Sequence, residues 1–210
     1  MRFINRRKRK GSIQNDLSYV KNKPSFKQEI KEKETFKPHF LFKILLVGYN
    51  ESGKIHYLEK FGNSWFESNT KLTIGISFEV KKIKIKDVNI KLQIWDLATE
   101  QRWKDLIPYY CRGALGAILM FETANSETLY KLSHWIPIIR EYTSNIPIIL
   151  MGNNDDVDNS RQVSAEEGIE FVKSEQLNGY FEASVTSGEN LENIFESLTR
   201  LIIKKFDYIK

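Results

Sequence analysis

The sequence has almost no cysteine and no long apolar run. Cys111 is the only cysteine among 210 residues, which excludes an intramolecular disulfide and is typical of a reducing compartment. No stretch approaches the roughly 18–20 apolar residues that a transmembrane segment needs. The basic first residues are not followed by an apolar segment, so no signal peptide is predicted. We therefore expect a cytoplasmic protein.

Both ends of the sequence also lack the residues that carry lipid anchors. The chain does not begin with Met-Gly, and its last residues, KKFDYIK, contain no cysteine for prenylation. We expect any membrane association to be peripheral.

Positive charge is concentrated near the start of the chain. Residues 1–38 hold 12 Lys and Arg against 4 Asp and Glu, a net charge of +8, whereas the rest holds 20 against 23, a net charge of −3. The cluster Arg6–Lys10 is typical either of a solvated arm or of a weak contact with anionic membrane. Nucleic acid is not favoured, because aromatic residues do not alternate with the positive charges. We predict a basic, mostly disordered extension over 1–38 and a folded domain over 39–208.

Apolar runs and apolar–polar alternation predict a six-stranded α/β domain. The predicted strands are 40–48, 76–85, 89–96, 116–122, 146–153 and 179–184. Helical spacing predicts helices at 54–61, 126–142, 164–176 and 190–206, the third opening with a Ser164–Glu167 capping box. This order predicts a mostly parallel sheet with one antiparallel edge hairpin and helices on both faces. Ligands bind at the carboxyl ends of the strands in such sheets.

The segment GYNESGKI closes the first predicted strand and opens the first helix. It matches the phosphate-binding loop G-x-x-x-x-G-K-[ST] except at Ile55, where the pattern needs a hydroxyl that ligates Mg²⁺. The candidate phosphate-binding residues are Gly48, Asn50, Glu51, Ser52, Gly53, Lys54 and Ile55.

Other strand ends carry residues that suit a guanine-nucleotide site. Thr73 lies in KLTIGISF, Asp96 ends the third strand in KLQIWD, GNNDD (152–156) follows the fifth strand, and EASVTSGEN (182–190) spans the end of the sixth. Together with YCRGA (110–114), these segments resemble the Ras-superfamily small GTPases, with the Rab branch as the nearest likeness, over about residues 40–206. The resemblance implies a P-loop NTPase fold, GTP and GDP as ligands, Mg²⁺ as cofactor, and GTP hydrolysis.

The resemblance also assigns roles to individual residues. Lys54 matches the lysine that contacts the β- and γ-phosphates, and Thr73 and Asp96 match residues that hold Mg²⁺, the aspartate through water. The implied guanine-binding residues are Asn153, Asn154, Asp156, Ser184, Val185 and Thr186. Asp156 matches the aspartate that reads the base. Phe78, Trp95 and Tyr110 match three aromatic positions that face effector or regulator proteins.

The residues that depart from the family pattern lie at positions that ligate Mg²⁺, contact the phosphates or support hydrolysis. Ile55 cannot ligate a hard cation. Glu51 places a carboxylate near the expected phosphates, where two like charges about 5 Å apart repel by roughly 3 kcal/mol at an effective dielectric constant near 20. Thr99 replaces a glycine whose amide contacts the γ-phosphate. Glu100 replaces the glutamine that orients the attacking water, which makes it the weak candidate for a catalytic residue.

Substitutions also affect the base-binding segments. Asn154 replaces a lysine whose stem packs along the base, and Val185-Thr186 replaces Ala-Lys. Three functions remain open: a nucleotide-binding switch with weakened Mg²⁺-dependent binding and slow hydrolysis, a pseudo-GTPase that serves as an interaction module in intracellular trafficking, and a working GTPase. We expect a monomer in each case.

Overall fold

The computed structural model describes residues 36–49, Lys54, 76–97, 101–155 and 160–208. The chain divides into two units, residues 1–37 and residues 38–210, and the second carries all the described strands and helices. The predicted disordered extension over 1–38 lies outside the described residues except at 36–38, and the predicted helix over 54–61 lies outside them except at Lys54.

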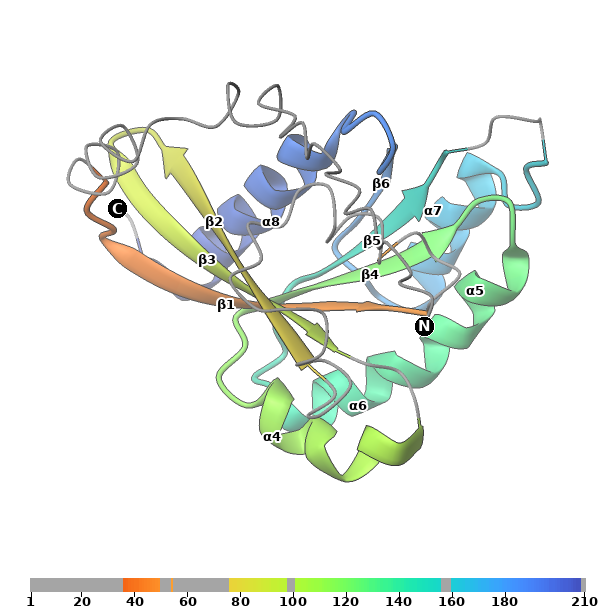
Figure 1. Ribbon diagram of the computed structural model, residues 1–210, viewed down its shortest axis with the longest axis horizontal. Coiled ribbons are helices and arrows are strands. Elements are labelled where there is room, and N and C mark those ends of the chain that lie inside the picture. The colour runs from red at the N-terminus through yellow and green to blue at the C-terminus, as the bar shows by residue number, and fades with distance from the viewer. Residues whose placement is uncertain (1–35, 50–53, 55–75, 98–100, 156–159, 209–210) are drawn as a thin grey trace, which may run out of the picture. The chain divides into compact units, whose positions relative to one another are not determined.

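Six strands form one sheet in the order β2-β3-β1-β4-β5-β6 (Figure 1). Their bounds are β1 Phe40–Gly48, β2 Ile76–Ile85, β3 Val88–Leu97, β4 Gly116–Glu122, β5 Ile148–Asn153 and β6 Gly179–Ala183. The edge hairpin β2–β3 is antiparallel and every other pair is parallel. The predicted fold is therefore confirmed, and the parallel strands bring their carboxyl ends to one edge.

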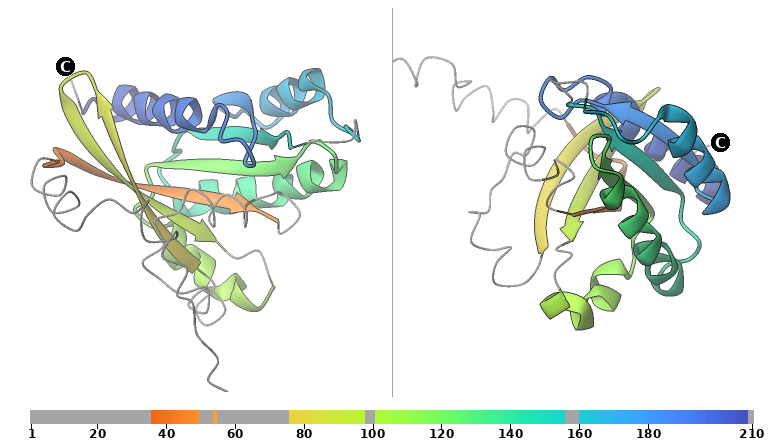
Figure 2. Two further views of the ribbon diagram at one scale, coloured as in Figure 1. Left: turned by 45° about the horizontal axis from the view of Figure 1, so that its top comes forward. Right: turned by 90° about the vertical axis from the view of Figure 1, so that its right-hand side faces the viewer.

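Helices cover both faces of the sheet (Figure 2). The helices are α4 Ile107–Cys111, α5 Ser126–Tyr130, α6 Trp135–Tyr142, α7 Ala165–Ser174 and α8 Leu191–Phe206, with 3-10 turns η2 Gln101–Leu106 and η3 Lys131–His134. Residues of α8 join one apolar core, and residues of α4, α5, η3 and α6 join the other. None of the helices in the described part of the chain is long and apolar enough to cross a membrane.

The central strands are apolar on both faces because both faces are covered. Ile44 and Leu46 of β1 pack into the core beneath α8, whereas Leu45 and Val47 pack into the opposite core. Such continuous apolar runs are typical of buried parallel strands. This burial explains why the sequence pattern predicted β1 without error.

The structure departs from the predicted elements in three places. The helix predicted over 126–142 is divided into α5, η3 and α6. Pro137 has no N–H to donate to the Ser133 carbonyl, so it suits the first turn of a helix, and α6 begins just before it. The Ser133 hydroxyl donates to the Tyr130 carbonyl at 2.7 Å. Strand β5 begins at Ile148 rather than 146, after Pro147. The helical segment 101–111 was not predicted, since η2 and α4 are too short to show a helical period.

Candidate functional site

The carboxyl ends of β1, β3, β5 and β6 meet at one edge of the sheet. Lys54 follows β1, Asp96 lies near the end of β3, Asn153 ends β5, and Ser184 follows β6. Four segments that are distant in sequence are therefore brought to the same edge of the sheet.

The first part of this site is a buried ion pair between Lys54 and Asp96. Lys54 Nζ lies 2.9 Å from Asp96 Oδ1, and each side chain is only 1% exposed. The same ammonium donates a hydrogen bond of 2.7 Å to the Leu97 carbonyl. An ion pair removed from water in this way holds both partners in place, because separating them would leave an uncompensated buried charge.

Two further polar side chains from β2 lie beside this pair. Ser77 is directly opposite Asp96 in the hairpin, and its hydroxyl donates to Asp96 Oδ2 at 3.2 Å. Glu79 points to the same face two residues later and is 5% exposed. Burial, with the Asp96 charge as a smaller cause, raises the pKa of Glu79 to about 7, against the smaller lowering effect of Lys81. The Lys54–Asp96 ion pair therefore has a second, buried carboxyl group, Glu79, on the same face of the hairpin.

The second part of the site is built around Asn153. Its Oδ1 accepts a hydrogen bond of 3.0 Å from the Val185 amide, and its Nδ2 donates to Glu122 Oε2 at 2.7 Å. Its carbonyl accepts from both the amide and the hydroxyl of Thr123. These contacts join the ends of β4 and β5 to the loop after β6.

Asp155 fixes the loop after β6 from the other side. Its Oδ1 accepts from the Ser184 hydroxyl at 2.6 Å and from the Thr186 amide at 2.9 Å. Burial acts to raise the pKa of Asp155, but hydrogen bonds led by the one from Ser184 outweigh it and hold this pKa below its ordinary value. The carboxylate is therefore ionised and positioned against the loop amides near neutral pH.

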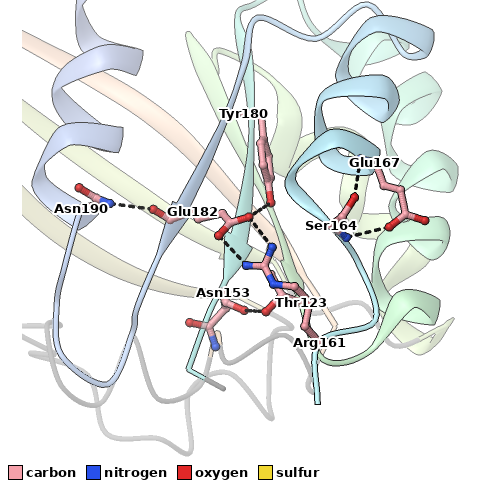
Figure 3. A network of polar contacts seen from close by, with 8 residues as sticks. All are labelled: Thr123, Asn153, Arg161, Ser164, Glu167, Tyr180, Glu182 and Asn190. Carbon is pink, nitrogen blue, oxygen red and sulfur yellow. Dashed lines mark hydrogen bonds and ion pairs between the residues drawn. The ribbon is translucent and has the colours of Figure 1, made fainter. Parts of the chain in front are cut away.

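A polar network anchors the strand that carries this loop (Figure 3). The guanidinium of Arg161 donates two hydrogen bonds to Glu182 of β6, at 3.1 and 2.7 Å, and the Tyr180 hydroxyl donates to Glu182 at 2.8 Å. The hydrogen bond from Arg161 holds the pKa of Glu182 below its ordinary value. Asn190, at the start of α8, donates to the Glu182 carbonyl at 3.1 Å. The loop Ser184–Thr186, which holds predicted base-binding residues and is called the base-side loop below, is thus supported from β6, the 160–163 segment and α8.

Polar side chains thus gather at the carboxyl edge of the sheet. They are a lysine that follows the first strand, an aspartate near the end of the third, and an asparagine and an aspartate that contact the loop after the sixth. The sequence model described as "Ras family" matches residues 43–204. The chain belongs to the Ras family.

Similar proteins place the chain with the Rab-like members of the Ras family. It is 36% identical over 169 residues to GTP-binding protein Rab-3D of Rattus norvegicus, covering 80% of this chain and 77% of the relative. It is 35% identical over 163 residues to Ras-related protein RABA4b of Arabidopsis thaliana, covering 77% and 72%. Ras-related protein Rab-2B of Dictyostelium discoideum is 34% identical over 186 residues, covering 88% and 90%. Membership in this family implies guanine nucleotide, Mg²⁺ and protein partners in general terms.

The structure describes only part of the predicted Ras-family site. It brings together Lys54, Asp96, Asn153, Ser184 and Val185 at the strand ends, with Asn154 exposed beside them. Gly48 ends β1, and the Thr186 amide donates to Asp155 in the loop after β6. The other predicted residues lie outside the described part of the chain: Asn50, Glu51, Ser52, Gly53, Ile55, Thr73, Thr99, Glu100 and Asp156. Their assigned roles stay predictions.

Sequence reasoning missed three polar residues of this site. Asp155 was treated as the variable position between Asn154 and Asp156, although two adjacent aspartates after a strand end are a visible signal. Ser77 could have been found from the register of the predicted hairpin, which places it opposite Asp96. Glu79 gave no signal, because a lone acidic residue in an alternating edge strand is usually solvated.

The predicted aromatic patch is assembled on the opposite face of the hairpin. Phe78 and Trp95 are direct cross-strand neighbours with ring centroids 4.5 Å apart in an edge-to-face arrangement. Tyr110 of α4 lies 6.3 Å from Trp95. All three residues are partly exposed, so they form a contiguous aromatic surface.

Proposed function

We propose that this Rab-like chain is a guanine-nucleotide-binding switch with weakened Mg²⁺-dependent GTP binding and slow GTP hydrolysis. The observation that carries the proposal is the buried ion pair of Lys54 and Asp96. It supports the proposal because Lys54, the proposed phosphate-binding lysine, and Asp96, the proposed metal-binding aspartate, lie in contact at the carboxyl edge of the sheet.

The ion pair supports weakened metal dependence. A divalent cation at this site needs the negative charge of Asp96, whose Oδ1 is 2.9 Å from Lys54 Nζ. Since Ile55 supplies no oxygen ligand, the chain offers the cation fewer hard donors than the family pattern. Asp96 therefore fits the metal and Ile55 does not.

The base side supports retention of the nucleotide. Asn153 and Asp155 order the loop at Ser184–Thr186, and an ordered loop with its amides directed at fixed acceptors loses little conformational entropy on binding. Asp156, adjacent to Asp155, keeps the residue type that reads guanine in this family.

Restoring the missing hydroxyl tests this account of the metal. In wild type, we expect EDTA to change the dissociation rate of fluorescent GDP by less than about threefold, because few metal ligands are lost. In Ile55→Thr, we expect EDTA to accelerate dissociation at least about tenfold, with the isosteric Ile55→Val as the size-matched control. Strong acceleration by EDTA in wild type contradicts the proposal of weakened metal dependence.

Restoring the family residues at positions 99 and 100 tests the proposal that GTP hydrolysis is slow. We expect Thr99→Gly/Glu100→Gln to raise the single-turnover rate of phosphate release at least about tenfold, because the added negative charge is removed and the water-orienting amide returns. A wild-type rate equal to that of the double variant would mean that turnover is not impaired.

A second function is favoured by the aromatic patch. Phe78, Trp95 and Tyr110 lie next to one another and are partly exposed, as an interaction module would require. The alternative proposal is a pseudo-GTPase that recruits partner proteins in intracellular trafficking. Persistence of partner binding in a variant that has lost all nucleotide binding would favour this alternative.

We also propose a cytoplasmic, peripherally membrane-associated monomer whose extension contacts anionic lipid through Arg6–Lys10. Neutralising these five residues should reduce flotation with phosphatidylserine vesicles, and the loss should be smaller at high salt. Unchanged flotation would rule this contact out.

A further inference from the structure

Trp95 lies at the centre of the aromatic patch formed by Phe78, Trp95 and Tyr110. Phe78 meets it edge-to-face, with ring centroids 4.5 Å apart, and Tyr110 of α4 lies 6.3 Å away. Within the described part of the chain, the indole Nε1 of Trp95 is buried and has no hydrogen-bond acceptor. A buried tryptophan usually has its N–H hydrogen bonded, which fixes the ring. The orientation of the Trp95 ring therefore depends on the contacts that its faces and edges make.

The ammonium group of Lys43 makes such a contact. Lys43 Nζ lies 3.4 Å from the centroid of the Trp95 ring, within the range of a cation–π interaction. Trp95 is opposite Leu45 in the parallel pair of β1 and β3, and Lys43 is two residues before Leu45. Residues two apart on a strand point to the same face, so the Lys43 side chain reaches the ring from the neighbouring strand.

The same ammonium group also contacts the end of α4. It donates a hydrogen bond of 2.9 Å to the carbonyl of Arg112, the residue that follows Cys111 at the end of this helix. Lys43 on β1 thus connects Trp95 on β3 with the helix that carries Tyr110. The aromatic patch is therefore joined through a charged side chain as well as through its own rings.

Fold stability does not explain a charged side chain at this position. Burial lowers the pKa of Lys43 to about 8, against a smaller raising effect of Cys111. A lowered pKa means that folding disfavours the ammonium form, so the charge is held here at a cost in folding free energy near neutral pH. An apolar side chain of similar length would avoid that cost. The charge is better explained by its effect on the neighbouring ring.

We propose that Lys43 is a positioning residue of the aromatic patch, whose ammonium group holds the Trp95 ring against α4 while Lys43 is charged. A partner that binds the patch then meets a ring that is already fixed and loses less conformational entropy on binding. Neutralising Lys43 frees the ring and weakens partner binding. This consequence rests on the proposed partner-binding role of the patch, whereas the restraint on the ring is measured on the protein alone.

Hydrogen exchange of the Trp95 indole N–H tests the proposal in the full chain without a partner. Because Nε1 is buried, its hydrogen exchanges with solvent when the ring moves or when the protein unfolds. NMR resolves the indole resonances of the four tryptophans, and Trp95→Phe identifies the one that belongs to Trp95. The backbone amide of Leu119, buried in the central strand β4, reports global unfolding in the same sample.

Lys43→Gln removes the charge but keeps a donor for the Arg112 carbonyl. We expect this variant to exchange the Trp95 indole hydrogen about 2- to 30-fold faster than wild type, the range that corresponds to loss of a cation–π contact. Lys43→Arg keeps the charge and should exchange like wild type. Lys91→Gln is the matched control and should also exchange like wild type. Lys91 lies on the same face as Lys43 but four residues before Trp95, about 13 Å along the strand.

The pH dependence provides a second readout. At pH 6.5 Lys43 is charged, and wild type should match Lys43→Arg. At pH 9 most of Lys43 is neutral, and wild type should exchange about 2- to 30-fold faster than the arginine variant. Base catalysis of exchange is the same in both proteins, so the ratio of their rates isolates Lys43.

The other titratable and charged groups around Lys43 are present in both proteins and cancel in this ratio. Burial raises the pKa of the Cys111 thiol to about 11 and also raises the pKa of Tyr110. These two groups therefore stay protonated from pH 6.5 to 9. The remaining groups on the neighbouring elements are Tyr109 and Arg112 at α4, Lys91 on β3, and Glu141 and Tyr142 at the end of α6.

Three results would overturn the proposal. The first is an unchanged Trp95 exchange rate in Lys43→Gln. The second is an equal acceleration of the Leu119 amide in that variant, which would mean a loss of global stability. The third is acceleration in Lys43→Arg as large as in Lys43→Gln, which would mean that the charge is not responsible. The partner-binding role fails separately, if replacing Phe78, Trp95 and Tyr110 leaves every partner interaction intact.

Discussion

At the scale of single residues, the structure shows which charged side chains of the site contact one another, and sequence comparison alone does not show this. Lys54 keeps its place in the family pattern, yet its ammonium is paired with Asp96, and Glu79 lies buried on the same face. Each charge depends on its neighbours for stability, so changing one should affect folding as well as binding.

Removing one partner of the ion pair should lower the free energy of unfolding more than removing both partners. Without nucleotide, we expect Lys54→Met to lower the free energy of unfolding by about 3–5 kcal/mol, because it leaves a buried carboxylate without its cation. Lys54→Met/Asp96→Asn should recover more than half of that loss. Urea unfolding of wild type, both single variants and the double variant measures the coupling. A loss below about 1 kcal/mol for Lys54→Met would mean that the pair is not buried in solution.

The buried carboxyl group of Glu79 should make stability fall as pH rises. Its pKa is about 7 in the folded protein against an ordinary value of 4.5, so the folded state favours the protonated form. The stability is fully present below pH 4.5 and is lost as pH rises towards and through 7, by at most about 3 kcal/mol.

Comparison with Glu79→Gln isolates this effect. The variant should match wild type near pH 4.5 and become the more stable protein above pH 7, as measured by urea unfolding at several pH values. Glu170→Gln, at an exposed position of α7, is the control and should leave the pH dependence unchanged. A constant difference between wild type and Glu79→Gln from pH 5 to 8 would refute the assignment.

At the scale of elements, the sequence predicted the strands and helices that have a clear apolar period. It missed a helix break and a loop contact that depend on single residues. The alternation in ISFEVKKIKI predicted β2 with its observed bounds, because one face of the hairpin is buried. The Ser164–Glu167 capping box is confirmed, with both of its hydrogen bonds present. Pro137 was read as part of one helix, since a 3.6-residue apolar period persists through the break. Asp155 was missed because the motif has no requirement at its position.

The packing of α7 on β6 connects fold stability to the base-side loop. A Cβ on Gly168 would lie 2.6 Å from Cζ of Tyr180, whose hydroxyl supports Glu182. We expect Gly168→Ala to destabilise the protein by about 1–2 kcal/mol, since this overlap outweighs the helix propensity gained with alanine.

Gly179→Ala is the matched control, because its added Cβ would meet its nearest atom at 3.5 Å, an ordinary contact. It should change stability by less than about 0.5 kcal/mol in thermal or urea unfolding. Equal stability of the Gly168→Ala variant and wild type would show that α7 can shift on β6 without cost.

At the scale of the whole molecule, net charge is distributed unevenly along the chain. The first 38 residues have a net charge of +8 and the remaining chain has −3. The fold is that of the Ras family, and Asp156 keeps the residue type that reads guanine in this family, whereas the residues at the predicted metal and hydrolysis positions depart from the family pattern. This combination is the reason for proposing binding that persists with slow turnover.

The nucleotide content of the purified protein tests this central claim most directly. Protein purified without added nucleotide is denatured, and the released compounds are identified and quantified by chromatography, with Asp156→Ala as the comparison. The account predicts GDP or GTP at close to one per chain in wild type and little in the variant. Absence of nucleotide, together with no binding of GDP or GTP at millimolar concentration with or without Mg²⁺, would contradict it.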